Sequence, residues 1–216
     1  MNDFSLRTAL IHSAKRLHQR NMLAAADGNI SYRIDNETIL ITPAGKPKAF
    51  IEPEDIAVIT LDNRIISGRP SSERLMHLAV YRQCPEAKTV VHAHPPTAIA
   101  WSIAKPNLQA LPNRCLSELI LACGTVPIVP YARPGTADMG EVLLPYLPMH
   151  RAMILARHGA LAWGESLDEA TGGLERIEHT AEILLRAEQL GGITDLPEEE
   201  VEFLLTLRKK IGNRLL

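Results

Sequence analysis

Short apolar runs separated by turn residues dominate the first half of the chain, and they constrain the fold more than any other feature. Runs of this kind are typical of β-strands closed by Pro, Gly or Asn. Two of them flank Asn63 and predict a hairpin. The predicted strands cover residues 30–34, 37–43, 56–62, 64–68 and 89–94. Because they do not alternate strictly with helices, we expect a central, mostly antiparallel sheet rather than a doubly wound parallel sheet.

Helical patterns surround these strands and fill the last third of the chain. The predicted inward face of the first helix consists of Leu6, Leu10, Ala14 and Leu17. Further helices are predicted at 72–83, 96–104, 115–123 and 138–147, with short strands at 127–131 and 152–160. Ser166 and Glu169 form a capping-box pattern at the start of a long helix that ends at Gly191. A final helix follows Pro197, so the sequence predicts an α/β fold with helices on both faces of the sheet.

Composition limits the number of domains and the classes of partner. The chain has 216 residues, of which 46% are hydrophobic, enough for one core, so we expect a single domain over residues 1–216. A net charge of −2 does not favour nucleic acid, and no apolar run approaches the roughly 18–20 residues that span a membrane. Three cysteines without C-x-x-C spacing suit a reduced compartment. We therefore expect a cytoplasmic protein without nucleic-acid or membrane partners.

Two histidines stand at the end of the apolar run TVVHAH. Residues two apart share one face of a strand, so His92 and His94 should point the same way. His158 also follows an apolar run, AMILAR, and precedes Gly159. Three imidazoles that leave one coordination position open are what a catalytic zinc ion requires. The alternative is three separate histidines that are hydrogen-bonded in the core.

A carboxylate and two hydroxyls precede the helix predicted at 72–83. Glu73 is either a first-turn residue that stabilises the helix or a group that faces a metal. Ser71 and Ser72, together with free N–H groups at a helix start, make a good anion site. His77 lies one helical turn after Glu73 and is either a residue that orients it or a plain core residue.

Other turns and motifs are less informative by themselves. The turns at 27–29 and 43–45 can expose backbone N–H groups, although turns of this kind often serve only as connections. The sequence contains no Walker A loop, no helix-opening G-x-G-x-x-G and no G-x-S-x-G elbow. Nucleotide binding and serine hydrolysis therefore lose support.

Taken in order, six segments resemble one family. They are GNIS (28–31), ITPAGKP (41–47), PSSE (70–73), VVHAHP (90–95), PYARPGT (130–136) and RHGALAWG (157–164). Their order and spacing are similar to class II aldolases of the L-fuculose-phosphate aldolase type, in the class II aldolase/adducin superfamily, over residues 5–210. The resemblance implies a central sheet with flanking helices and a homotetramer with active sites at subunit interfaces.

The resemblance also implies roles for individual residues. It implies that His92, His94, His158 and Glu73 hold Zn²⁺, with Mn²⁺ or Co²⁺ as alternatives, and that Glu73 acts as the catalytic acid–base group. The phosphate-binding positions that it implies are Gly28, Asn29, Ala44, Gly45, Ser71 and Ser72.

The reaction that the resemblance implies is cleavage of a ketose 1-phosphate into dihydroxyacetone phosphate and an aldehyde. Fuculose, deoxyribulose and methylthioribulose 1-phosphates are the candidate substrates for this zinc-dependent aldolase. The alternatives on the same fold are a methylthioribulose-1-phosphate dehydratase, a 4-epimerase and a decarboxylase. A non-catalytic, adducin-like interaction module is a further alternative. The presence of the three histidines and Glu73 argues against it.

The sequence departs from the fuculose-phosphate aldolase pattern at the aldehyde end. Aldolases of this type use tyrosines after the helix that follows H-x-H and in the C-terminal segment, where they help to donate a proton. Here Glu118 stands near the first position, and the C-terminal RKKIGNRLL contains no tyrosine. The metal and phosphate halves of the site therefore match the family, whereas the aldehyde half differs. Glu118 is the candidate for a substitute polar group; its alternative is an exposed helical glutamate.

Overall fold

A computed structural model describes residues 3–216 and shows one eight-stranded sheet. The strand order is β4-β3-β2-β1-β5-β8-β7-β6, and neighbouring strands are antiparallel except for the parallel pair of β6 and β7. The strands are β1 (Asn29–Arg33), β2 (Thr38–Ile41), β3 (Ala57–Thr60), β4 (Ile65–Ser67), β5 (Thr89–Ala93), β6 (Ile128–Val129), β7 (Ala152–Leu155) and β8 (Gly159–Gly164). The predicted mostly antiparallel sheet is confirmed.

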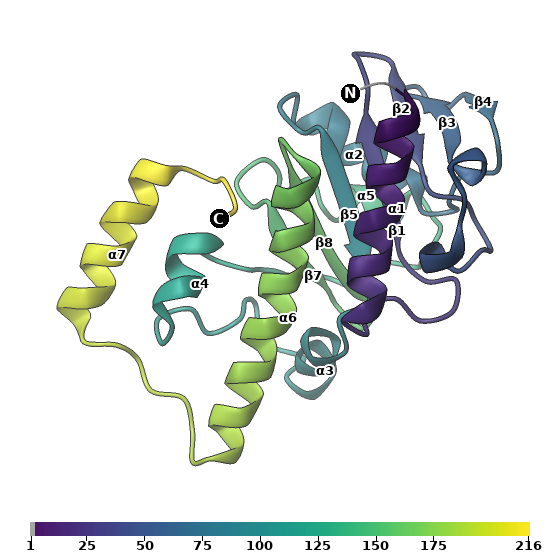
Figure 1. The fold of residues 1–216 in the computed structure, drawn as a ribbon. Coiled ribbons are helices and arrows are strands. Elements are labelled where there is room, and N and C mark those ends of the chain that lie inside the picture. Colours follow the sequence, from purple (N-terminus) through teal and green to yellow (C-terminus); the bar gives the residue numbers. More distant parts are fainter. Residues whose placement is uncertain (1–2) are drawn as a thin grey trace.

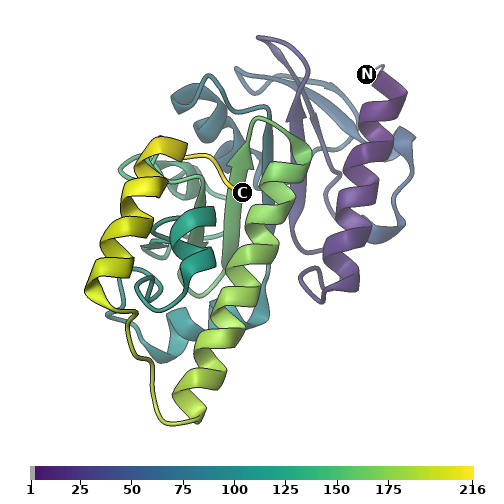
Figure 2. The same cartoon turned by 60° about the vertical axis from the view of Figure 1, so that its left-hand side comes forward.

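Helices cover both faces of this sheet, as predicted (Figure 1). On one face lie α1 (Asp3–Gln19), α3 (Pro96–Ala104), α4 (Ser117–Ala122) and α6 (Leu167–Gln189). On the other lie α2 (Arg74–Gln83) and α5 (Asp138–Glu141). The last helix, α7 (Glu198–Ile211), packs outside α4 (Figure 2). Two 3₁₀ turns, η1 (Lys48–Phe50) and η2 (Pro53–Asp55), connect β2 to β3.

The alternation of side chains along β5 decides which face carries the histidines. Val91 belongs to the core beneath α1 and α6, whereas Val90 belongs to the core beneath α2. His92 lies two residues after Val90 and therefore points to the α2 face. That is also the face from which Glu73 and His77 reach the sheet.

Four sequence predictions need correction. The strand predicted at 152–160 is two strands, because Arg157 adopts a left-handed conformation with φ of 59° and turns the chain into β8. The helix predicted to reach residue 147 ends at Glu141 and continues as turns, and the strand predicted at 127–131 is only Ile128–Val129. Ser166 caps α6, but the Glu169 carboxylate pairs with Arg151 instead of completing the capping box.

None of the helices in residues 3–216 combines the length and apolar character that a membrane span requires.

Candidate active site

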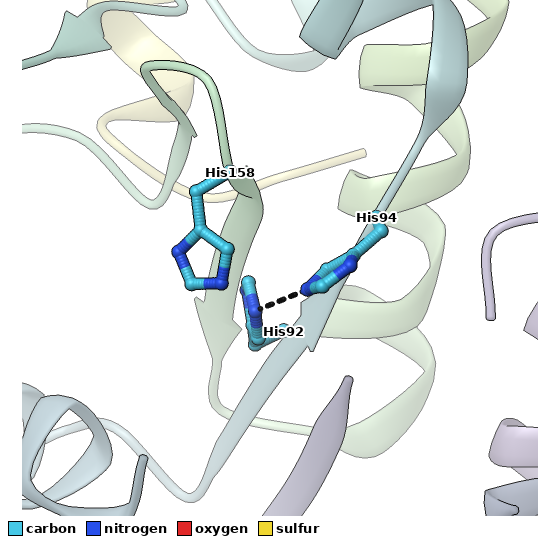
Figure 3. Close-up of side chains that lie close together, drawn as sticks. All are labelled: His92, His94 and His158. Atoms are coloured by element: carbon cyan, nitrogen blue, oxygen red, sulfur yellow. Dashed lines mark hydrogen bonds between the residues drawn. The ribbon is translucent and has the colours of Figure 1, made fainter. Parts of the chain in front are cut away.

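His92 and His94 lie at the end of β5 with their rings on the α2 face, as the strand alternation predicts. Nδ1 of His92 lies 2.9 Å from the carbonyl oxygen of Ala160 on β8, so it donates there and leaves the Nε2 lone pair free. Nδ1 of His94 lies 3.3 Å from Oδ2 of Asp27. The two Nε2 atoms lie 3.1 Å apart (Figure 3). Both rings therefore present the same nitrogen to one point.

The turn between β7 and β8 brings His158 to the same point. Its ring centroid lies 4.8 Å from that of His92 and 5.0 Å from that of His94. Figure 3 shows the three rings directed toward one another, two from the end of β5 and one from the turn before β8. One ring nitrogen from each residue lies within 4.8 Å of the others. The prediction that three histidines meet at strand ends is confirmed.

Gly159 makes this convergence sterically possible. A methyl group in place of its hydrogen would lie 2.6 Å from the Ala93 carbonyl oxygen and 2.7 Å from Cε1 of His92. It would also lie 3.0 Å from Cδ2 of His94. Because real carbon contacts lie near 3.5–4.0 Å, only glycine lets β8 pass this close to both rings.

Glu73 completes the cluster from the N-cap of α2. Its Oε1 lies 3.1 Å from Nε2 of His158, and its Oε2 lies 3.4 Å from Nε2 of His92. Asn29 donates from Nδ2 to Oε2 at 2.7 Å. Burial raises the pKa of Glu73, but the contacts with His158, His92 and Asn29 outweigh burial and hold it well below its usual range. Glu73 is therefore a carboxylate at neutral pH.

The donor set fits a divalent transition metal. Three imidazoles and a carboxylate are ligands that Zn²⁺ accepts, and three protein ligands with an open position are typical of catalytic zinc. Burial lowers the pKa of His92 to about 3 and also lowers that of His94. These rings are neutral at pH 7, which is the state that binds a metal. The hydrogen bond of His92 to Ala160 and the contact of His94 with the Asp27 carboxylate fix the ring orientations.

Three segments that carry the expected phosphate positions lie side by side. The turn after β2 is joined to the segment before α2 by the hydrogen bonds of Ala44 N to Arg69 O and of Ser71 N to Thr42 O. The turn before β1 meets them where Asn29 contacts Glu73. The six positions are Gly28, Asn29, Ala44, Gly45, Ser71 and Ser72. The prediction that these six bind phosphate stays a prediction.

The six positions differ in what they can still bind. Gly45 and Ser72 are exposed. The Asn29 side chain is committed to Glu73 and His77, and the hydroxyl of Ser71 accepts from Glu73 N.

Sequence reasoning missed Lys48, which is 2% exposed. Its ammonium donates to the carbonyl oxygens of Ala26 and Lys46, both at 2.7 Å, and so joins the turn before β1 to the turn after β2. Burial lowers the pKa of Lys48, while the charges of Asp27 and Glu73 raise it. A lysine in a Pro-rich turn gives no sequence signal for burial, because lysine is usually exposed.

Glu118 lies away from the histidine cluster in this chain. It is exposed in the first turn of α4, which packs against α6 and α7 on the opposite face of the sheet from Glu73. The structure therefore places Glu118 where the alternative interpretation, an exposed helical glutamate, expects it.

Comparisons with known proteins show the family of this chain. The model of the family described as Class II Aldolase and Adducin N-terminal domain matches residues 8–185. A 3-oxo-tetronate 4-phosphate decarboxylase of Escherichia coli O6:H1 (strain CFT073) is 34% identical over 195 residues, which are 85% of this chain and 90% of the relative. A methylthioribulose-1-phosphate dehydratase of Methylococcus capsulatus is 31% identical over 194 residues, 85% of this chain and 95% of the relative.

A solved structure gives the same result for the fold. The structure of an L-fuculose 1-phosphate aldolase superposes with a TM-score of 0.84 at 28% identity, covering 95% of this chain and 96% of that one. The predicted resemblance to the fuculose-phosphate aldolase type is confirmed. The chain belongs to the class II aldolase and adducin N-terminal domain family.

Proposed function

We propose that the protein is a metal-dependent decarboxylase of a phosphorylated 3-oxo sugar acid, with 3-oxo-tetronate 4-phosphate as the substrate. From the sequence we expected an aldolase first and placed the decarboxylase among the alternatives. The 34% identity to a 3-oxo-tetronate 4-phosphate decarboxylase, over nine-tenths of that relative, supports the decarboxylase better. His92, His94, His158 and Glu73 are the proposed ligands of Zn²⁺ or another divalent metal.

The two reactions share one intermediate and differ in the group that leaves. In a 3-oxo acid the carboxylate lies β to the ketone, so breaking the C1–C2 bond releases CO₂ and leaves its electron pair as an enediolate across C2 and C3. One proton added at C2 gives dihydroxyacetone phosphate. An aldolase reaches the same enediolate by breaking C3–C4 of a ketose 1-phosphate, but it must also remove a proton from the C4 hydroxyl. Decarboxylation therefore needs one proton transfer fewer.

The observation that carries the proposal is that the acid–base group in contact with His92 and His158 is a single carboxylate, Glu73. The four tyrosines have other surroundings: Tyr32 packs against the core beneath α1 and α6, Tyr81 is buried between α2 and β1, Tyr146 packs against the core on the α2 face, and Tyr131 is exposed. A site in which one carboxylate contacts both His92 and His158 suits the loss of CO₂, which needs one proton transfer at C2, better than the release of an aldehyde.

Glu73 has the electrostatics of a proton carrier. When a substrate displaces it from the histidines, the contacts with His158 and His92 that lower its pKa are lost, while burial, which raises its pKa, remains. Glu73 then takes up a proton and delivers it to C2 of the enediolate. A divalent metal held by His92, His94 and His158 would supply positive charge that stabilises the negative charge of the enediolate.

The phosphate end of the substrate is proposed to bind at the start of α2. The N-terminal end of a helix favours an anion, and Ser72 is exposed there. The six phosphate-binding positions expected from the family, and a homotetramer with active sites between subunits, belong to this proposal.

Product analysis with a panel of substrates tests the proposal. Metal-loaded protein should convert 3-oxo-tetronate 4-phosphate into CO₂ and dihydroxyacetone phosphate, and neither metal-stripped protein nor His94→Ala should do so. Fuculose 1-phosphate and methylthioribulose 1-phosphate should react much more slowly. Rapid release of an aldehyde from a ketose 1-phosphate would instead favour the aldolase, which the similarity to the fuculose 1-phosphate aldolase structure keeps as the second candidate.

A further inference from the structure

A buried chain of polar side chains runs from Glu73 into the protein behind the histidine cluster. Asn29 donates to Glu73, and its Oδ1 lies 2.5 Å from Nε2 of His77. Nδ1 of His77 lies 2.7 Å from Oγ of Ser31, which lies 2.8 Å from the hydroxyl of Tyr81. The four side chains beyond Glu73 are all 2% exposed or less. Polar groups buried this deeply are expected to have all their hydrogen bonds made.

Two elements supply the chain with matching spacing. Glu73, His77 and Tyr81 are four residues apart at the start of and along α2, so they share one face of that helix. Asn29 and Ser31 are two residues apart on β1 and share one face of that strand. The face of α2 packs on the face of β1, and the five side chains interleave into a single line of contacts.

The donors and acceptors along this buried chain of side chains can be assigned in only one way, with each residue donating toward Glu73. The Glu73 carboxylate only accepts, so Asn29 must present its amide NH₂ to it and its oxygen to His77. His77 must then donate from Nε2. A neutral imidazole has one N–H, so Nδ1 accepts from the Ser31 hydroxyl, and Ser31 in turn accepts from Tyr81. Burial lowers the pKa of His77 to about 4, which keeps the ring neutral at pH 7.

We propose that His77 and Ser31 are positioning residues that hold the Asn29 amide in the orientation that donates to Glu73. In this arrangement they aim the Glu73 carboxylate at the histidines and at the carbon that it protonates. Without the His77 donor, the buried Asn29 oxygen loses its hydrogen-bond partner, and the amide is held only at its NH₂ end. The amide would then shift, and Glu73 would lose a fixed donor and turn away from the cluster. The catalytic consequence rests on the proposed function, whereas the His77 tautomer does not.

The tautomer can be read in metal-free protein by ¹⁵N NMR of labelled histidine. We expect wild-type His77 to carry its proton on Nε2 at pH 7. The ¹⁵N signals of His77 are assigned as those that disappear in His77→Gln. Ser31→Ala removes the donor to Nδ1 but leaves the Asn29 oxygen at Nε2, so the proton should stay on Nε2 while the Nδ1 resonance shifts. A proton on Nδ1, or on both nitrogens, in the wild-type protein would overturn the proposal. This readout is independent of the reaction that the enzyme catalyses.

Kinetics of the metal-loaded enzyme test the consequence for Glu73. His77→Leu should lower kcat for decarboxylation by about 10- to 100-fold, with KM changed less than about threefold. His77→Gln should recover most of the loss, because its amide can both donate and accept. Ser31→Ala, a smaller change that is expected to fold, should lower kcat by about three- to tenfold.

A matched control separates positioning from general damage to the core. Thr180 is buried on α6, and its hydroxyl has no hydrogen-bond partner within residues 3–216. Thr180→Val should therefore leave kcat unchanged. Equal losses in His77→Leu and Thr180→Val, or no rescue by His77→Gln, would contradict the proposal. A wild-type enzyme without decarboxylase activity would refute the proposed function and leave the tautomer measurement as the test of His77.

Discussion

Replacing Gly159 by alanine tests whether the close approach of β8 to the histidines is needed for metal binding. The added methyl group would lie 2.6–3.0 Å from the Ala93 carbonyl oxygen and from ring carbons of His92 and His94. Ordinary contact is about 3.5–4.0 Å, so either the β5 backbone or both rings must move by roughly 0.5–1 Å. Overpacking of this kind typically costs about 1–3 kcal/mol.

The expected effect is weaker metal binding rather than unfolding. If the strain falls on the metal-bound arrangement, affinity should fall by about 5- to 150-fold, since 1.4 kcal/mol is tenfold. Competition with a chromophoric chelator measures the affinity, and thermal unfolding of the metal-free protein measures the change in stability.

Gly172→Ala provides the matched control for this substitution. Gly172 lies inside α6 and has no atom within 4 Å of the added methyl group. Alanine should stabilise the helix by about 0.5–1 kcal/mol and leave metal affinity unchanged. If Gly159→Ala bound metal within about twofold of wild type, the steric reasoning would be wrong.

Three further predictions concern the acid–base group, the pH dependence of stability and the buried lysine. Glu73→Gln should keep its metal on three imidazoles and lose about 10²–10⁴-fold in kcat, whereas His94→Ala should lose the metal; equal metal loss in both, measured by elemental analysis, would make Glu73 chiefly a ligand. The folded-state pKa values of His77, about 4, and His92, about 3, lie below the ordinary 6.5. The unfolded chain therefore binds these protons first, and the stability of metal-free protein should fall as pH drops from about 6.5 toward 4, by up to ~1.4 kcal/mol per pH unit for each group. Flat denaturant midpoints over this range would contradict that. Lys48→Met should raise KM for the phosphorylated substrate by about tenfold, because two charge-assisted hydrogen bonds between the turns are lost; unchanged KM would show that the turns hold without it.

The sequence predicted the parts of the site that depend on local periodicity. Strand alternation placed His92 and His94 on one face, and the spacing of Glu73 and His77 indicated a shared helix face. The same four-residue spacing extends to Tyr81. This spacing could have predicted that Glu73, His77 and Tyr81 line one face of α2 and belong to the buried chain of polar side chains.

The parts that were missed depend on backbone conformation and on contacts between distant segments. The turn at Arg157 carries no glycine or proline, so residues 152–160 read as one strand, and β8 was not separated from β7. The contacts of the Asn29 side chain with Glu73 and His77 were not predicted, and its role in phosphate binding stays a prediction. Lys48 is buried only because two separate turns supply carbonyl oxygens to it. Spacing along the chain carries no information on either arrangement.

The most direct test of the central claim follows the carbon and the proton together. 3-Oxo-tetronate 4-phosphate labelled with ¹³C at C1 should be incubated in D₂O with metal-loaded protein. The account predicts one ¹³CO₂ for each dihydroxyacetone phosphate, with a single deuterium on one face of the former C2, and Glu73→Gln should lose both the rate and the stereochemical preference. Deuterium on both faces at the spontaneous rate, or an intact carbon skeleton, would contradict it.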